Sequence, residues 1–377
     1  MKKIFRTLHL WLSIPFGLVI TVICFSGAML VFEPEITEWR HPSRYFAEQA
    51  GDQPLPVGEL IQSVNAQLPD TLSVAGVQIP NSPKRNYRMS LSGQNRTAAV
   101  YVNPYSGEIK DMLLAPQSNF FTTMRQLHRW LLGDFKRDGS FSLGKTVVGV
   151  STLLFVFILI SGIAVWIPKT KKALALRLKI KMKNGWRRFW YDLHVAGGMY
   201  AAAVLLTMAL TGLTWSFGWY RTAFYCAFGV EAAQPPHGAA PQPASRPERG
   251  GDSERRKTGS GINYSLWQTV VDSLNAQYRG YKNLTVQDGK ASVSLVGWGN
   301  SRASDSYAFD AETGAITSAA YYKDSERAGK LRGWIFAVHV GSWGGMATRI
   351  LAFLAALLGA TLPLTGYYIW IRKKWKR

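Results

Sequence analysis

Four long apolar runs constrain this chain more than any other feature. They are Leu10–Phe32, Leu143–Ile167, Leu193–Phe217 and Ala347–Ile371. A helix needs about 20 such residues to cross the hydrocarbon core of a bilayer. The sequence therefore predicts an α-helical membrane protein with four transmembrane helices and the lipid bilayer as a partner. The first run is too long for the core of a signal peptide and lacks a small-residue cleavage site, so we expect a retained helix.

The positive charge of the chain is concentrated beside these runs. The net charge is +21, and the segments 1–9, 168–192 and 372–377 hold 17 Lys and Arg against one acid, Asp192. Loops with excess Lys and Arg stay in the cytoplasm. We therefore expect a multi-pass protein of the bacterial inner (cytoplasmic) membrane, with both termini cytoplasmic and large periplasmic loops at Glu33–Ser142 and Gly218–Met346. Little charge remains to indicate a nucleic-acid partner, so none is expected.

The two halves of the chain share motifs in the same order. Gly27 follows His9 by 18 residues, and Gly212 follows His194 by 18 residues. Three further pairs are Ser63-Val-Asn-Ala-Gln67 with Ser273-Leu-Asn-Ala-Gln277, Val102-Asn-Pro-Tyr-Ser-Gly-Glu-Ile109 with Phe309-Asp-Ala-Glu-Thr-Gly-Ala-Ile316, and Ser161-Gly-Ile-Ala-Val-Trp-Ile-Pro-Lys169 with Thr365-Gly-Tyr-Tyr-Ile-Trp-Ile-Arg-Lys373. Each half has two spans and starts on the cytoplasmic side, so two parallel internal repeats are predicted. The Pro-, Gly- and Ser-rich segment 232–261 interrupts the second repeat and is predicted to be disordered.

Each outer loop reads as a helix followed by strands. The predicted helices are Val57–Leu68 and Leu266–Gln277, from their helical periodicity. The predicted strand pairs are Asn86–Leu91 with Ala98–Val102, and Ala291–Val296 with Ser306–Phe309. The segments Asn103–Gly107 and Asp310–Gly314 have turn chemistry, with Gly where a positive φ is expected.

This arrangement resembles the PepSY-associated transmembrane family. Asn103-Pro-Tyr-Ser-Gly-Glu-Ile109 and Asp310-Ala-Glu-Thr-Gly-Ala-Ile316 are similar to its signature, although Ala315 stands where the signature has an acid. The resemblance implies two α+β PepSY-like periplasmic domains framed by four spans. The expected organisation is 1–32 (N-terminus and first span), 33–142 (first domain), 143–167 (second span), 168–192 (basic cytoplasmic loop), 193–217 (third span), 218–346 (second domain) and 347–377 (fourth span and tail). Some family members are inner-membrane ferric-siderophore reductases with two haems, and the resemblance implies that role here.

Four of the six histidines occupy equivalent places in the two halves. His9 and His194 open the first and third spans, while His128 and His339 precede the second and fourth. Histidine near the membrane needs a partner, and axial histidine is a common haem ligand. Two haems of b type are therefore expected, one between His9 and His194 and the other between His128 and His339. The alternative is four interfacial histidines hydrogen-bonded to backbone or lipid head groups.

The predicted role is transmembrane electron transfer that reduces a ferric siderophore in the periplasm. The alternative is a non-redox siderophore permease, or a PepSY-type sensor or inhibitor. The chain has no GxGxxG after a strand and no Walker motif, so electrons are expected from an external donor, either quinol or a cytosolic reductase. Basic residues near each pair are candidate partners of the haem propionates: Arg6, Arg187 and Arg188 inside, and Arg125, Arg129 and Arg332 outside. No catalytic residue is assigned.

Overall fold

The computed structural model describes residues 2–47, 53–92, 98–114, 119–133, 141–231, 262–297 and 299–375. The insertion predicted at 232–261, which contains His237, lies outside them. The chain divides into two compact units. Unit 1 comprises residues 1–33, 119–241 and 334–377, and unit 2 comprises 34–118 and 242–333.

Unit 1 contains four helices that are long and apolar enough to cross a membrane. They are α1 (Lys2–Val31), α6 (Leu143–Trp166), α9 (Gly198–Ser216) and α14 (Gly345–Lys374). A π-helical turn, η2 (Leu193–Gly197), leads into α9. The four predicted spans are therefore confirmed, and the chain is a multi-pass membrane protein. The first helix begins eight residues earlier than Leu10, because the prediction followed only the apolar run and the preceding basic residues are also good helix formers.

The four long helices form a closed bundle. The helix α1 packs against α6 and α14, and α9 packs against the same two helices. Leu205 and Leu213 of α9 are almost fully buried in this core. At Gly359 of α14 an added Cβ would lie 2.9 Å from the side chain of Leu205, so glycine permits the close approach of α9 and α14.

A shorter helix precedes α6 in the sequence, and another precedes α14. They are α5 (Phe120–Trp130) and α13 (Arg327–His339). Asn119 caps α5 by accepting a hydrogen bond from the Thr122 amide at 2.9 Å. Left-handed backbone follows each helix, at Leu131 (φ 49°) after α5 and at Gly341 (φ 73°) after α13, and it turns the chain back into the next span.

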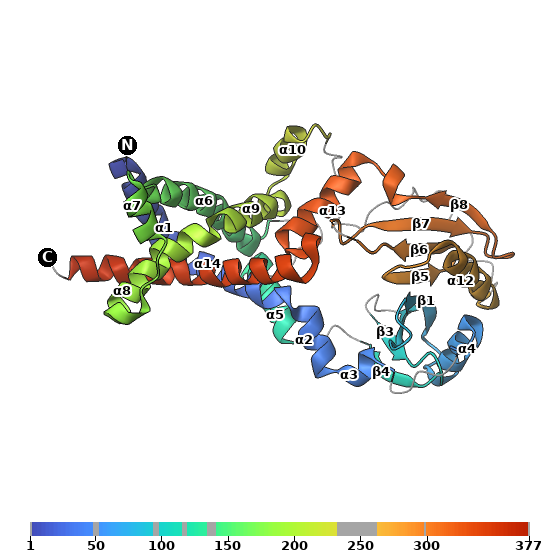
Figure 1. Ribbon diagram of the computed structural model, residues 1–377. Helices are drawn as coiled ribbons and strands as arrows, with labels where there is room; N and C mark the ends of the chain where they lie inside the picture. Colours follow the sequence, from blue (N-terminus) through green and yellow to red (C-terminus); the bar gives the residue numbers. More distant parts are fainter. Residues whose placement is uncertain are drawn as a thin grey trace. The chain divides into compact units, whose positions relative to one another are not determined.

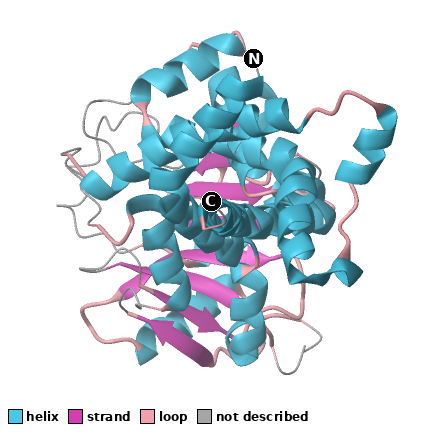
Figure 2. Cartoon of the chain, turned by 90° about the vertical axis from the view of Figure 1, so that its left-hand side faces the viewer, coloured by secondary structure: helices cyan, strands magenta, loops and turns pink. Residues whose placement is uncertain are grey.

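The remaining short helices of unit 1 lie at the ends of the bundle. They are α7 (Lys171–Arg177), η1 (Met182–Asn184), α8 (Gly185–Asp192), α10 (Gly218–Ala227) and η4 (Ser342–Gly344). Figure 1 shows both chain termini at the same end of unit 1 as α7 and α8. Figure 2 looks at that end along α14. The three basic segments found in the sequence therefore share one end of the bundle, as an even number of crossings requires.

Unit 2 is built around one antiparallel sheet of eight strands. The strands are β1 (Ser73–Pro80), β2 (Tyr87–Ser92), β3 (Ala99–Val102), β4 (Ile109–Leu113), β5 (Asn283–Gln287), β6 (Lys290–Ser294), β7 (Ser304–Phe309) and β8 (Ile316–Ala320). Their order is β4-β3-β2-β1-β5-β6-β7-β8. The helices of this unit are α2 (Glu33–Arg40), α3 (Pro42–Tyr45), α4 (Val57–Gln67), α12 (Ser265–Gln277) and η3 (Tyr322–Asp324).

The two outer segments share this sheet through the pairing of β1 with β5. Val77 lies opposite Val286 in that pair. The helices α4 and α12 pack on these strands and bury one common core, in which Leu60, Trp267 and Leu284 are almost completely enclosed. The helices and strand pairs expected from the sequence correspond to α4, α12, β2–β3 and β6–β7. The β1–β5 junction was not predicted.

The two signature turns have the same geometry. Gly107 and Gly314 both have φ of 73°. The Gly107 amide donates to the Asn103 carbonyl at 3.0 Å, and the Gly314 amide donates to the Asp310 carbonyl at 2.8 Å. A positive φ is readily adopted by glycine, so both turns need glycine at this position.

Candidate functional site

The first candidate site is the pair His9 and His194. His9 lies on α1 and His194 lies in the π-helical turn η2, with ring centres 6.4 Å apart and ring planes at 78°. A π-helical turn often marks a functional position in a helix. Just before this turn, Asp192 is buried and accepts hydrogen bonds from the Arg188 side chain at 2.9 Å and the Lys181 amide at 3.1 Å. These bonds fix the entry to η2 and thereby the position of His194.

The second candidate site is the pair His128 and His339. His128 lies on α5 and His339 ends α13, with ring centres 6.1 Å apart and ring planes at 54°. The Trp215 ring packs edge-on against His339 at 5.1 Å. The structure thus brings the four histidines together in the two pairs that the sequence predicts.

Each of the four rings is hydrogen-bonded through Nδ1 to a backbone carbonyl of a neighbouring span. The pairs of atoms are His9 Nδ1 with Ile158 O (3.0 Å), His128 Nδ1 with Ile23 O (2.8 Å), His194 Nδ1 with Leu362 O (3.1 Å) and His339 Nδ1 with Met208 O (2.9 Å). A carbonyl oxygen only accepts, so Nδ1 carries the proton and donates. Nε2 of each ring then keeps its lone pair, which is the state of a metal-ligating histidine whose other nitrogen is held by an outer partner.

A glycine lies four residues after each accepting carbonyl. We call the carbonyl and glycine a histidine seat, and the four seats are Ile23/Gly27, Ile158/Gly162, Met208/Gly212 and Leu362/Gly366. An added Cβ at these glycines would lie 2.8, 3.1, 3.1 and 3.3 Å, respectively, from Cε1 of the seated histidine. In an α-helix the carbonyl of residue i points toward residue i+4, and side chains tilt toward the N-terminus. A side chain at i+4 would therefore cover the carbonyl that the imidazole must reach.

A hydroxyl residue precedes every one of these glycines. Ser26, Ser161, Thr211 and Thr365 each donate to the carbonyl of their own seat, at 2.9 to 3.1 Å. Thr365 Oγ1 also lies 3.0 Å from Nδ1 of His194, and Thr211 Oγ1 lies 3.1 Å from Nδ1 of His339. Ser161 Oγ lies 3.3 Å from Nδ1 of His9. These hydroxyls supply a second polar contact that restrains the ring.

Burial keeps the second pair uncharged. It lowers the pKa of His339 to about 4, with a further contribution from the His128 imidazole. Burial also lowers the pKa of His128, and the Arg129 guanidinium adds to the shift while the bond to Ile23 opposes it. Both rings are therefore neutral at pH 7, which is the form that binds a metal.

The first and third spans each carry a histidine of the first pair and the seat of a histidine of the second pair. On α1, His9 belongs to the first pair, whereas Gly27, 18 residues later, holds His128 of the second pair. The same spacing on the third span separates His194 from Gly212, which holds His339. Eighteen residues correspond to about 27 Å of helix. The pairs therefore lie near opposite ends of the bundle.

The described residues hold no group of three His, Cys, Asp or Glu that could bind a metal ion. Each site thus offers two imidazoles and no third ligand of these types from the described part of the chain. A structural or catalytic zinc site takes three or four protein ligands. Haem iron differs because its macrocycle supplies four nitrogens and the protein supplies only the axial positions.

The six arginines named from the sequence have varied surroundings. Arg125 pairs with Glu33 at 2.6 Å, Arg188 pairs with Asp192 at 2.8 Å, and the Arg129 guanidinium lies 4.4 Å from the centre of the Trp130 ring. Arg6 and Arg187 are exposed, and Arg332 lies on α13, two turns before His339. A role of these arginines beside a cofactor stays a prediction.

Comparison with known proteins places this architecture in one family. No curated protein matches the chain. The family model described as the PepSY-associated TM region matches residues 6–373, from the first basic segment to the end of α14. The matched region includes all four histidines, their seats and both signature turns. The chain therefore belongs to the family of proteins with the PepSY-associated transmembrane region.

Proposed function

We propose that the chain carries electrons across the membrane through two haems of b type, each bound by one histidine pair, and reduces a ferric siderophore in the periplasm. The observation that carries this proposal is the repeated arrangement of two neighbouring imidazoles whose Nδ1 atoms are both hydrogen-bonded to backbone carbonyls. When bound, haem iron supplies a one-electron carrier that alternates between the ferric and ferrous states.

The spacing of the rings supports shared axial ligation. A ligating imidazole nitrogen lies about 2.0 Å from its metal, and the ring centre lies about 1.1 Å further away. Two imidazoles on opposite sides of one ion would therefore have centres about 6.2 Å apart. The observed separations of 6.4 and 6.1 Å match this value. If the two imidazoles of a pair were merely in van der Waals contact, nothing would require this separation at both sites.

The protein's own residues would orient the ligands and set the path of the electrons. The seats restrain the four rings with Nε2 available, so little rearrangement accompanies a change of charge at the site. The chain beside the histidines is closely packed, since Ala196 and Leu213 on the third span and Ala337 on α13 are almost fully buried. The two levels of histidines give electrons an entrance at one end of the bundle and an exit at the other. The electron donor would be quinol or a cytosolic reductase.

The orientation follows from the shared end of the basic segments. We expect a cysteine at Glu312, in the unit 2 turn, to react with a membrane-impermeant maleimide in cells whose outer membrane has been opened. Lys172→Cys, in the basic loop, should react only after the inner membrane is broken. Both changes are made with Cys226→Ser, because Cys226 is exposed whereas Cys24 is buried. The reverse labelling pattern would contradict the proposed topology.

Reoxidation of the reduced protein tests the proposed activity. The purified protein is reduced with dithionite, freed of excess reductant and mixed without oxygen with a ferric siderophore. We expect loss of the reduced spectrum and capture of ferrous iron by a ferrous-specific chelator. The gallium complex of the same siderophore is the control, since gallium(III) has the same charge but accepts no electron under these conditions. A reduced spectrum that persists with every ferric chelate would exclude the reductase function.

A further inference from the structure

A polar cluster lies in unit 2, away from the histidine pairs in the sequence. Tyr278 follows α12, and Asp305 and Tyr307 lie two residues apart on β7, on the same face of the strand. The hydroxyl of Tyr278 donates to Oδ2 of Asp305 and lies 2.6 Å from the hydroxyl of Tyr307. Oδ1 of Asp305 accepts from the Tyr322 amide at 2.7 Å. Asp305 and Tyr307 are 6% and 4% exposed, so this is a buried oxygen cluster.

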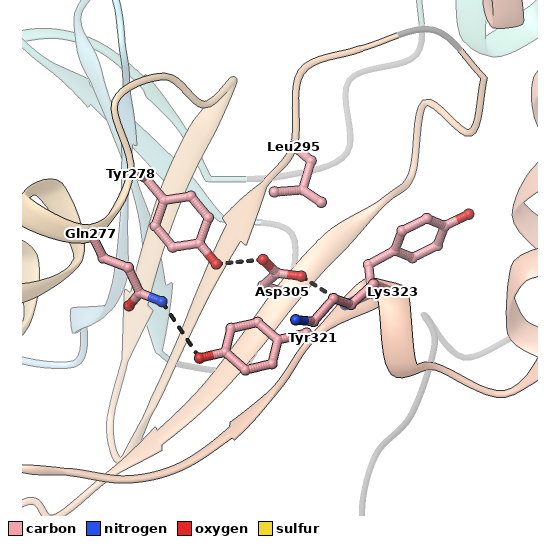
Figure 3. A pocket seen from close by; sticks show the side chains of 7 residues that line it. Gln277, Tyr278, Leu295, Asp305, Tyr321 and Lys323 are labelled. Carbon is pink, nitrogen blue, oxygen red and sulfur yellow. Dashed lines mark hydrogen bonds between the residues drawn. The ribbon is translucent and has the colours of Figure 1, made fainter.

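The cluster opens onto a pocket of about 350 Å³. Figure 3 shows the Asp305 carboxylate in this pocket beside the Tyr278 hydroxyl, with Leu295 above and the Tyr321 side chain below. Gln277, Tyr321, Tyr322 and Lys323 line the remaining wall. A ligand can therefore reach the Asp305 carboxylate and the Tyr278 hydroxyl from outside.

The first outer segment has the same fold at this place without the polar groups. Strand register aligns Val102 with Phe309, because each pairs with the isoleucine after its signature turn. Asp305 and Tyr307 then correspond to Ala98 and Val100, and Tyr278 corresponds to Leu68 after α4. All three counterparts are buried and apolar. The fold therefore packs here without a carboxylate or phenols, and burying such groups costs free energy that packing does not require.

We propose that Tyr278, Asp305 and Tyr307 form a binding site for a hard trivalent cation such as iron(III). Phenolate and carboxylate oxygens are hard donors, and hard cations prefer oxygen ligands. Neighbouring oxygens of an octahedral site with metal–oxygen distances of about 2.0 Å lie about 2.8 Å apart, close to the 2.6 Å between the Tyr278 and Tyr307 hydroxyls. Three protein oxygens leave three positions for a small chelator or water. The site is independent of the proposed haem function.

Proton release accompanies binding at this site. The pKa of Tyr278 is raised by burial and by its hydrogen bonds to Asp305 and Tyr307. Burial raises the pKa of Tyr307 as well. Both phenols are protonated in the metal-free protein, and each loses its proton to solvent when its oxygen binds the cation. Affinity should consequently rise with pH, by up to about 100-fold per unit if both phenols ionise.

Equilibrium dialysis with gallium(III) citrate tests the site on the full chain, because one tridentate citrate leaves three of the six positions of the ion open. Gallium shares the charge of iron(III) and does not exchange electrons with a haem, so the outcome does not depend on the proposed reductase function. We expect a single bound gallium ion per chain. Asp305→Asn and Tyr278→Phe should each weaken binding at least about tenfold. Tyr281→Phe is the matched control, because Tyr281 is a buried tyrosine of the same unit whose hydroxyl donates to Asn275 instead.

A second probe separates direct ligation from docking of an intact complex. Gallium in a hexadentate hydroxamate chelator has no open position and should not bind through these oxygens. Equal binding of both gallium complexes would overturn the proposal, as would unchanged affinity in Asp305→Asn with unchanged near-ultraviolet circular dichroism. Tyr278→Phe removes one oxygen from a partly exposed side chain, so it keeps the test valid if Asp305→Asn fails to fold.

Discussion

Replacing any one of the four paired histidines by alanine is expected to remove one haem and leave the other. His9→Ala and His194→Ala should affect the same haem, because their rings are 6.4 Å apart. His128→Ala and His339→Ala should affect the second haem for the same reason. Haem content should fall from two to about one per chain in each variant, since one imidazole alone cannot supply both axial ligands. Haem assay and reduced-minus-oxidised spectra of the purified variants measure this.

His41→Ala is the control for these four variants, because His41 is exposed and lies next to α3 in unit 2. It should keep both haems. The pairing would be contradicted if His9→Ala and His128→Ala removed the same haem while His194→Ala removed the other. The second pair has a further predicted effect. His128→Ala and His339→Ala should abolish reduction of a ferric chelate even when the haem of His9 and His194 is still reducible.

Adding a methyl group at a seat glycine is expected to weaken the haem held by the seated histidine. Gly27→Ala places a Cβ 2.8 Å from Cε1 of His128, and Gly366→Ala places one 3.3 Å from Cε1 of His194. The ring must move away from its carbonyl, most of all at Gly27. Loss of such an outer contact typically costs about 10–100-fold in metal affinity. Titration of the haem-free protein with haem measures the change.

The seat prediction has a specific pattern. Gly27→Ala should disturb the haem of His128 and His339, although Gly27 shares its helix with His9. Gly359→Ala is the control, since its added Cβ would lie 2.9 Å from the Leu205 side chain and 3.1 Å from Sγ of Cys24, with no histidine atom among its nearest neighbours. It should retain both affinities. Equal loss in Gly27→Ala and Gly359→Ala would show that general helix packing, rather than the seat, accounts for the glycines.

The spans and the histidine pairs could be predicted from the sequence because their signals are local. An apolar run of about 20 residues is typical of a helix that crosses a membrane. His9 and His194 also stand at equivalent places in two matching halves, which fixes their common depth. Pairing by membrane side then follows from geometry, and the observed ring distances agree with it.

The seats were not predicted, because a backbone carbonyl has no sequence signature. The sequence nevertheless contains a pattern at these positions. Each of the four spans has one Ser-Gly or Thr-Gly dipeptide, and these are Ser26-Gly27, Ser161-Gly162, Thr211-Gly212 and Thr365-Gly366. The spacing of 18 residues between His9 and Gly27 is visible in the sequence, but His9 belongs to the first pair whereas Gly27 contacts His128 of the second pair. The glycine of each seat holds a histidine from another helix, and that assignment requires the packed bundle.

The shared sheet of unit 2 was missed for a different reason. The burial of β1 alternates as far as Gly76 and again from Val77, so its period-two pattern is interrupted, and its register with β2 shifts between Val74 and Gly76. Its partner β5 lies about 200 residues away in the sequence. Register between such distant strands depends on the packing of α4 and α12 beneath them, and local pattern does not encode it. The oxygen cluster at Asp305 joins residues 27 and 29 positions apart, from the end of α12 and from β7, and no local pattern indicates that contact.

The most direct test of the central claim is the haem content of the purified, folded full-length protein. The pyridine haemochrome assay gives the amount and type of haem, and the absorption spectrum of the untreated protein gives its coordination. The paired and seated histidines predict two haems of b type per chain, both six-coordinate and low-spin. A folded protein that stays colourless when haem is supplied during expression would contradict the claim. So would bound haem whose amount and spectrum are unchanged in all four histidine variants.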